Sequence, residues 1–579
     1  MKKFYLGKDI IMELIAHFNQ GRAPHARMAE HPESYVLIHF GLNTFTDREW
    51  GYGDEDPALF NPVDFDADAI VSAVKAGGFE GIVLVCKHHD GFCLWPTRTT
   101  EHNISKSPWR NGKGDLVREV SDAARRAGLA MGFYVSPWDR NHPEYGRAEY
   151  VQIFREQLRE IYTQYGPAFE VWFDGANGGD GYYGGARETR RVPLGKYYGW
   201  QEVWGIVRDL QPDAAIFSDV GPDLRWVGNE LGYARPDCFA STTPALHVNA
   251  EPDSQPAPGF CSNLELGCGN VNGGYYIPPE CDVPLRPGWF YHAREDNQLR
   301  SVQELVRIYM ASVGAGGYLN LGIAPDRRGL LHENDVKRLR EFGEARRRLL
   351  GNGVLPQTEV RLASGCAQSG SFGSLQTVNL VELREDLSAG ERVVEYTLTL
   401  FAGEQPVHCE KGTAVGRRRM RAFASVQADR WELQAVSRDG QDLCLQLACY
   451  AAPEEFFRED QAAAAVTDRP DYYKAPEPVD RDNTLTWTLP EEQRIRGFIF
   501  IPFEFWHGLP ELYQLEVCTV DGTWQTVARG EFSNIRANPI PQVVEWDQPV
   551  CGKAIRLTAE RLAEHHYKVL CREFGVLLG

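Results

Sequence analysis

From about residue 34 to residue 345, hydrophobic and polar positions form a repeating unit: a short apolar run, a polar loop and an amphipathic segment. In the segments 115–128 and 147–165, apolar residues recur every three or four positions, which predicts helices. The short apolar runs between such segments predict strands. The clearest runs are 35–40 (YVLIHF), 81–87 (GIVLVCK), 130–136 (AMGFYVS), 170–174 (EVWFD), 215–218 (AIFS) and 317–321 (GYLNL).

Strands that alternate with helices indicate a parallel sheet with helical crossovers. The first five runs begin at residues 35, 81, 130, 170 and 215, so successive strands start 40 to 49 residues apart. This rhythm fits a (β/α)8 barrel with enlarged loops. A doubly wound sheet is the competing α/β fold, but no G-x-G-x-x-G motif follows the first run. We therefore predict an α/β chain that begins with a (β/α)8-type (TIM-like) barrel.

The pattern changes after Leu350. Runs such as 393–401, 485–489 and 513–520 alternate apolar and polar residues, with no long helical segments between them. This alternation is typical of β-sandwiches. We predict a barrel domain over residues 1–350 and β-sandwich domains over 351–470 and 471–579, and we expect the charged, proline-containing segment 454–482 to link the two sandwiches.

The chain has 579 residues, with 61 basic and 80 acidic residues and a formal net charge of -19. This excess of negative charge disfavours nucleic acids and anionic membrane surfaces as partners. The 13 cysteines include no C-x-x-C pair, which favours reduced thiols over a disulfide framework. Charged residues interrupt the N-terminal apolar stretch, and no run is long enough to span a membrane, so we expect a cytoplasmic protein. The oligomeric state stays open, a homo-oligomer included.

In (β/α)8 enzymes the active site lies at the carboxyl ends of the strands. Polar side chains and tryptophans follow nearly every predicted strand of this chain. Chance would not place such groups at the same end of so many strands, so we predict a site at this rim. The residues, in chain order, are His39, Asn43, Glu49, Trp50, Lys87, His88, His89, Asp90, Tyr134, Trp138, Asp139, Trp172, Asp174, Asp219 and Asn320.

The densest of these stretches is CKHHDGFCLW, residues 86–95. Adjacent residues of a strand point to opposite sides, so His88 and His89 do not easily chelate one ion. Cys86 and Cys93 lack the second pair of ligands that a zinc site needs. We therefore expect no metal and no cofactor, and hydrogen-bonded core histidines remain the plain alternative. Histidines, carboxylates and tryptophans on one rim do suit a sugar, which offers hydroxyl groups and a flat C–H face.

A glycosidase also needs two carboxyl groups flanking the scissile bond. They lie about 5–5.5 Å apart in enzymes that retain the anomeric configuration and about 6.5–9.5 Å apart in those that invert it. Asp174 follows the apolar run VWF and precedes a glycine, which places it at the barrel mouth. The alternative role for a lone aspartate in this position is a helix N-cap.

Seven motifs together resemble the α-L-fucosidases of glycoside hydrolase family 29, in the same order. SPWD and GNE, within these motifs, are closer to the branch that prefers α-1,3/1,4-linked fucose. The motifs are HFGLNTFTDREWG (39–51), KHHDGFCLWPT (87–97), FYVSPWDRN (133–141), VWFDG (171–175), RWVGNE (225–230), ECDVPLRPGWFYH (280–292) and GGYLNLGIAPDRRGLL (316–331).

The resemblance implies a retaining exo-α-L-fucosidase that acts on fucosylated oligosaccharides. It implies that Asp174 is the nucleophile and that a second carboxyl group is the acid/base. We choose Glu230 for that role and expect its pKa to be raised, while Asp174 stays ionised. Asp219 and Glu280 are the alternatives. The resemblance also implies a fucose site made by His39, Glu49, Trp50, His88, His89, Tyr134 and Trp172.

The stretch 485–578 looks like a discoidin-type (coagulation factor 5/8 type C) β-sandwich, which either binds carbohydrate or only packs against the barrel. The basic, aromatic insertion 181–198 either shapes leaving-group subsites or is a surface loop. Lys87 either adds positive charge to the site or lies on the surface.

Two other functions remain. One is a related exo-glycosidase for α-L-galactosides, because an apolar pocket for a methyl group rejects an added hydroxyl only weakly. The other is a non-catalytic glycan-binding protein, against which the intact Asp174 and Glu230 argue. A serine or cysteine hydrolase is disfavoured, because the chain has no G-x-S-x-G motif.

Overall fold

The computed structural model describes residues 28, 30–219, 221–242, 263–458, 469–481, 483–502, 508–532, 535, 539–562 and 568–579. The chain divides into two compact units. The first consists of the residues up to Thr46, Trp50–Pro284 and Val302–Arg458, and the second consists of Asp47–Glu49, Leu285–Ser301 and the residues from Glu459 onward. The N-terminal segment, much of the expected linker and the aromatic residues at 503–507 lie outside the described residues.

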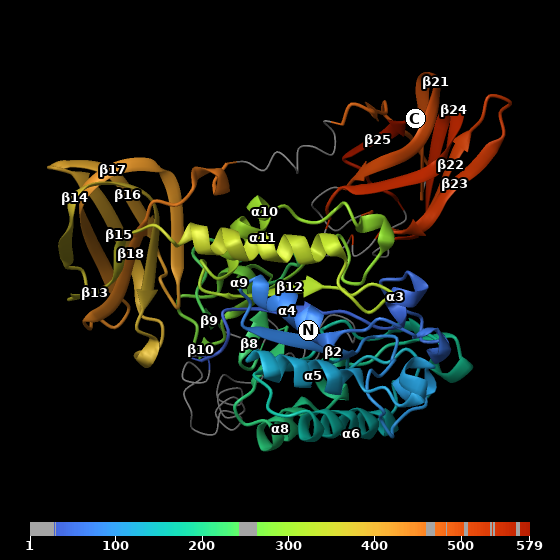
Figure 1. The fold of residues 1–579 in the computed structure, drawn as a ribbon, viewed down its shortest axis with the longest axis horizontal. Coiled ribbons are helices and arrows are strands. Elements are labelled where there is room, and N and C mark those ends of the chain that lie inside the picture. The colour runs from blue at the N-terminus through green and yellow to red at the C-terminus, as the bar shows by residue number, and fades with distance from the viewer. Residues whose placement is uncertain are drawn as a thin grey trace, which may run out of the picture. The chain divides into compact units, whose positions relative to one another are not determined.

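Eight parallel strands close into a barrel in the first unit, as predicted (Figure 1). Their order around the barrel follows the chain, and the last strand pairs with the first. The strands are β1 (Ser34–Ile38), β2 (Gly81–Lys87), β3 (Ala130–Val135), β4 (Glu170–Trp172), β7 (Ala215–Ser218), β8 (Leu224–Trp226), β11 (Pro279–Pro284) and β12 (Tyr318–Ile323).

Two of these strands, β8 and β11, do not stand out as apolar runs. β8 has three residues and includes Arg225, and β11 carries Glu280 and Asp282. All three charged side chains are buried, and Arg225 donates to backbone carbonyls such as that of Phe239, while Glu280 accepts from the Tyr35 hydroxyl. Hydrophobic patterning cannot detect a strand that buries charge.

Helices connect the barrel strands and cover them. The predicted helices are present as α5 (Leu116–Ala127) and α6 (Ala148–Gln164). The side chain of Asp115 accepts a hydrogen bond from the Arg118 N–H and so caps α5. The other helices are α3 (Leu42–Thr46), α4 (Ala67–Ala76), α7 (Leu194–Tyr197), α8 (Trp200–Leu210), α9 (Asn263–Cys268), α10 (Val302–Ser312) and α11 (Glu333–Leu349).

A six-stranded antiparallel sheet follows the barrel within the first unit. Alternate residues of its strands point into an apolar core that includes Leu398, Trp431 and Leu445. Its strands, in sheet order, are β13 (Gly353–Leu362), β18 (Leu443–Tyr450), β14 (Ala367–Glu385), β17 (Arg419–Ser437), β15 (Val393–Ala402) and β16 (Gln405–Gly412).

The second unit contains the C-terminal antiparallel sheet, whose core includes Trp487, Phe498 and Phe574. The predicted fold class, a TIM-like barrel followed by C-terminal β-sandwich domains, is therefore confirmed. Among the described residues, no helix is both long and apolar enough to cross a membrane. The strands of this sheet are β19 (Tyr472–Lys474), β25 (Glu573–Leu578), β21 (Thr484–Ile501), β24 (Gln542–Leu562), β22 (Pro510–Cys518) and β23 (Trp524–Glu531), with β20 (Val479–Arg481) paired to β21.

Candidate active site

Aromatic and histidine rings from the ends of β1, β2 and β3 gather at one end of the barrel. His39 follows β1, and its ring centroid lies 5.6 Å from that of His88, which follows β2. The ring of Tyr134, on β3, lies 6.1 Å from that of His88 and 6.3 Å from that of His39. Burial lowers the pKa of His39 to about 3 and holds the pKa of His88 below its usual value. Both imidazoles are therefore neutral at neutral pH and offer a donor and an acceptor without a charge.

His89 lies beside His88, with their ring centroids 4.1 Å apart. Its Nδ1 lies 2.8 Å from the Ser136 hydroxyl, and its ring meets Trp50 edge-on at 5.1 Å and Trp138 at 5.3 Å. Strand β2 ends at Lys87, so the alternation of side chains along a strand does not separate the two histidines. The rings of His88 and His89 therefore form one cluster with the two tryptophans.

Asp174 immediately follows Phe173 beyond β4, at the same end of the barrel. Its Oδ2 accepts a hydrogen bond of 2.8 Å from the Tyr134 hydroxyl and lies 3.7 Å from His89 Nε2, while its Oδ1 accepts from the Ala176 N–H. Burial raises the pKa of Asp174 to about 6, and the hydrogen bonds from Ala176 and Tyr134 limit that rise. The carboxylate is therefore ionised at neutral pH, with a higher pKa than an exposed aspartate has.

Asp219, just beyond β7, lies against the backbone next to Asp174. A Cβ atom on Gly175 would stand 2.2 Å from Asp219 Oδ2, so only glycine permits this approach. Burial, followed by the charge of Asp174, raises the pKa of Asp219 to about 7. Two carboxyl groups close together cannot both ionise easily, which is the condition that separates acid and base roles.

Glu230 is half-buried on the loop that follows β8. Asn229 shapes this loop: its Oδ1 accepts a hydrogen bond from the Leu231 N–H, and its Nδ2 donates to the Tyr233 carbonyl. Asp282, on β11, has a raised pKa. Burial is the largest cause, followed by the negative charges of Glu230, Glu280 and Asp174. The carboxyl groups of Glu230 and Asp174 therefore both act on the pKa of Asp282.

Glu280 lies inside the barrel, as the second residue of β11. Its carboxylate is fully buried and accepts hydrogen bonds from Tyr35, Trp172 and Asn320. Lys87 is also fully buried, and its ammonium donates to the Tyr150 hydroxyl at 2.9 Å. Of the two alternatives for Lys87, a place on the surface is therefore excluded.

The insertion after β4 forms a short hairpin from β5 (Gly179–Gly181) and β6 (Glu188–Arg190). Within it the Tyr183 hydroxyl accepts a hydrogen bond of 3.1 Å from Trp138 Nε1 and donates to the Gly179 carbonyl. This contact joins the hairpin to the tryptophan that packs on His89.

Comparisons with known proteins point to one family. The model of the α-L-fucosidase family matches residues 22–231. The chain is 35% identical to α-L-fucosidase 1 of Arabidopsis thaliana over 432 residues, which are 68% of this chain and 80% of the plant protein. The crystal structure of a glycoside hydrolase 29 family member from an unknown rumen bacterium matches 96% of this chain and 99% of that one, with a TM-score of 0.68 and 34% identity. The structure of SpGH29 matches 74% of this chain and 97% of that one, also with 34% identity and a TM-score of 0.64.

The chain belongs to the α-L-fucosidase family. It is a glycoside hydrolase of family 29, as the motifs imply. Of the predicted site residues of this α-L-fucosidase, the structure brings five together around Asp174, and Trp172 stacks on one of them, Tyr134, at 5.0 Å. The five are His39, Trp50, His88, His89 and Tyr134.

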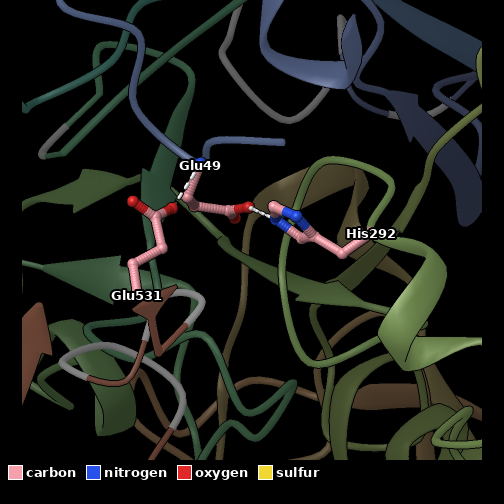
Figure 2. A group of neighbouring side chains, drawn as sticks. All are labelled: Glu49, His292 and Glu531. Atoms are coloured by element: carbon pink, nitrogen blue, oxygen red, sulfur yellow. Dashed lines mark hydrogen bonds and ion pairs between the residues drawn. The ribbon is translucent and has the colours of Figure 1, made fainter. Parts of the chain in front are cut away.

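Glu49 belongs to the second unit of the α-L-fucosidase, where it meets His292 and Glu531 (Figure 2). Its carboxylate accepts hydrogen bonds from the backbone of Trp289 and Phe290 and lies 3.1 Å from His292 Nε2. The Glu49 N–H donates to the carboxylate of Glu531. These contacts hold Glu49 firmly on both its main chain and its side chain.

Glu49, His292 and Glu531 are residue types that bind metals, and one ligand atom of each lies within 4.8 Å of the others. Burial opposes a charge on His292, but its hydrogen bonds to Asp47 and Glu49 outweigh burial and raise its pKa to about 9. A protonated imidazole has no lone pair for a metal. The hydrogen-bonded network therefore accounts for this cluster better than a metal site does.

Sequence reasoning missed two residues of the α-L-fucosidase site, Ser136 and Asp282. Ser136 stands in SPWD, where the tryptophan and aspartate draw attention and the serine does not. Asp282 lies on a strand that hydrophobic patterning did not detect. Its only signal is its place in the motif ECDVPLRPGWFYH, two residues beyond Glu280.

Proposed function

We propose that this α-L-fucosidase removes terminal α-1,3- or α-1,4-linked L-fucose from branched oligosaccharides, with retention of configuration by double displacement. The observation that carries the proposal is the Asp174 carboxylate, held by Tyr134 and Ala176 beside His89. The SPWD and GNE motifs support the linkage preference by their resemblance to one branch of the family.

In the first step, Asp174 attacks the anomeric carbon of fucose. The glycosidic bond breaks, and the leaving oxygen takes a proton from Glu230. In the second step, Glu230 removes a proton from water, the water oxygen attacks the anomeric carbon, and the bond to Asp174 breaks. Two displacements at one carbon restore the original configuration.

The surroundings of Asp174 fit the nucleophile. Tyr134 and Ala176 stabilise its charge before attack, and burial destabilises that charge, so that transfer of the charge into a covalent bond is favoured. The resting carboxylate is therefore ionised but not deeply stabilised, which suits attack on the anomeric carbon.

The proposed fucose site combines neutral imidazoles and flat aromatic faces. His39, His88 and His89 have lowered pKa values because they are buried, so they hydrogen-bond hydroxyl groups as neutral rings. Trp50 offers an apolar face to the C–H groups of the sugar, and Trp172 supports the site by stacking on Tyr134. Tyr134 and Glu49 complete the proposed set, and Glu49 is included because its motif resembles that of the family.

We also propose the domain boundaries 1–350, 351–470 and 471–579, with the last domain discoidin-like, and a cytoplasmic location. The antiparallel sheets after residue 350 support the division. The twelve cysteines within the described residues are free thiols, which supports a reducing compartment.

A panel of fucosylated oligosaccharides tests the linkage. We expect free fucose from Lewis-type α-1,3 and α-1,4 linkages, and turnover at least about tenfold slower for α-1,2 and α-1,6 linkages. An aryl α-L-galactoside should be a slower substrate, because it differs by one hydroxyl. Faster release from α-1,2 or α-1,6 linkages would refute the preference, and tight binding of every fucoside without release would favour the non-catalytic alternative.

A further inference from the structure

The carboxylate of Glu280 is a buried acceptor on which several donors converge. Its Oε2 accepts a hydrogen bond of 2.6 Å from the Tyr35 hydroxyl. Its Oε1 accepts two bonds of 2.8 Å, one from Trp172 Nε1 and one from Asn320 Nδ2. The two oxygens therefore have separate partners, and only Oε1 holds a residue of the proposed fucose site.

A second buried acid, Glu170, adjoins Glu280. Burial first, and then the charge of Glu170, raise the pKa of Glu280 well above its usual value, and burial raises the pKa of Glu170 to about 8. His31 Nε2 lies 3.0 Å from the Glu170 carboxylate. At neutral pH the two acids therefore hold at least one proton between them, which reduces the cost of burying both.

Trp172 connects Glu280 to the site. Its ring stacks on Phe217 at 4.2 Å with an interplanar angle of 9°, and on Tyr134 at 5.0 Å with an angle of 26°. Tyr134 in turn donates the 2.8 Å hydrogen bond to Asp174. Stacking fixes the plane of an indole ring but leaves it free to slide or turn within that plane. A hydrogen bond to Nε1 removes that freedom.

We propose that Glu280 is a positioning residue, which fixes the indole of Trp172 and through it the Tyr134 and Asp174 side chains for attack on the sugar. The proposal rests on the proposed roles of Trp172, Tyr134 and Asp174. It gives Glu280 a task other than proton transfer, because its carboxylate is fully buried and its oxygens are taken by Tyr35, Trp172 and Asn320.

Loss of the acceptor also has a structural cost, since the donors of Tyr35, Trp172 and Asn320 would be left unpaired in the barrel interior. Reduced stability alone therefore does not test the proposal. The test needs a readout that depends on Trp172 and that a merely structural role would leave unchanged.

The experiment is a double-mutant cycle on the full chain with an aryl α-L-fucoside, measuring kcat, KM and Tm. Glu280→Met has no acceptor, and Glu280→Gln keeps an amide oxygen that can replace Oε1. Each is made with Trp172 present and with Trp172→Phe, which keeps a ring but lacks the N–H. With Trp172 present, we expect Glu280→Met to lower kcat about tenfold or more. In the Trp172→Phe background, the same substitution should lower kcat less than about threefold. Glu280→Gln should keep most of the kcat of the parent protein, because its amide oxygen replaces the lost acceptor.

Tyr35→Phe is the matched control, because it removes the Tyr35 hydrogen bond to Oε2 and leaves both bonds on Oε1. It should lower Tm but keep kcat and KM within about twofold of the parent protein. If Glu280→Met does not fold, Glu280→Asp replaces it, because its carboxylate is one methylene further from Trp172. The same measurements are then made with Trp172 and with Trp172→Phe.

Equal losses of kcat in both Trp172 backgrounds, no rescue by Gln, or an equal kinetic loss in Tyr35→Phe would overturn the proposal. These comparisons are made among variants on one substrate. They therefore stay separate from a failure of the nucleophile assignment, which would appear as turnover by an Asp174 variant.

Discussion

The hydroxyl of Tyr134 donates a hydrogen bond to the carboxylate of Asp174 and, after burial and the Ala176 N–H, helps to set the pKa of the proposed nucleophile. Asp174 must be ionised to attack, and its pKa is about 6, so kcat/KM should fall as the pH drops below about 6. Tyr134→Phe removes a hydrogen bond that lowers this pKa. The acid limb of the kcat/KM profile should therefore move to higher pH, by about one unit.

The profile is measured with an aryl fucoside for the parent protein and for Tyr134→Phe. A lower kcat/KM at all pH values with an unmoved acid limb would mean that Tyr134 only binds the sugar. Since Tyr134 also belongs to the proposed fucose site, the position of the limb, and not its height, is the informative quantity.

Glu230 and Asp219 compete for the acid/base role. Glu230→Ala should lower turnover of natural glycans by about a thousandfold, because their leaving oxygen needs a proton. An aryl fucoside with an acidic phenol needs little protonation, so its first step should suffer at least about tenfold less. Asp219→Asn is the matched comparison. If Asp219→Asn shows this difference between substrates and Glu230→Ala does not, the acid/base is Asp219.

For individual residues, the sequence predicted which side chains belong to the site better than it predicted their hydrogen-bond partners. His88, His89, Tyr134 and Asp174 were expected in one site, and the structure places their rings and carboxylate together. The hydrogen bond between His89 and Ser136 was not expected. Such pairings depend on how β2 and β3 align, and a register shift between Val85 and Lys87 changes that alignment.

Among the elements, the segment Leu285–Ser301 shows how one buried charge can hold a loop in place. His292 bridges Asp47, at 2.7 Å from Nδ1, and Glu49, at 3.1 Å from Nε2. Its pKa of about 9 lies above the value of about 6.5 expected in the unfolded chain. A raised pKa means that the stabilisation is complete below about pH 6.5 and is lost as the pH rises through about 9.

Raising the pH from 6.5 to 9.5 should therefore destabilise the second unit, by on the order of 2 kcal/mol. His292→Gln should lose stability at pH 6.5 and show a weaker pH dependence over this range. Urea unfolding of both proteins at the two pH values measures this. If the free energy of unfolding depends on pH equally in the two proteins, groups other than His292 cause that dependence.

The strands illustrate which elements a sequence pattern can detect. β2 and β3 are apolar along nearly their whole length and were predicted within one or two residues. β8 and β11 were not, because Arg225, Glu280 and Asp282 interrupt the apolar pattern. Glu280 is stabilised by partners far away in sequence, such as Tyr35, which only the closed barrel brings near.

For the whole molecule, the order of strands and helices and the change of pattern after Leu350 were enough to predict a barrel followed by antiparallel sheets. The assignment of Asp47–Glu49 and Leu285–Ser301 to the unit that contains the C-terminal sheet was not predictable. These short segments, which the structure describes throughout, contain no strand and only one 3-10 turn, and they contribute buried residues such as Phe290 together with polar pairs such as Glu49 with His292.

We propose that this α-L-fucosidase retains configuration through a covalent bond to Asp174. A 2-deoxy-2-fluoro-L-fucosyl fluoride is the reagent for the most direct test, because the fluorine atom on C2 slows both displacements while the good fluoride leaving group at C1 keeps formation of the intermediate faster than its breakdown. Mass spectrometry of the inactivated, digested protein should find one fluorofucosyl group on the peptide that contains Asp174. A label on another carboxyl group, or hydrolysis that yields the inverted anomer with no adduct, would contradict the account.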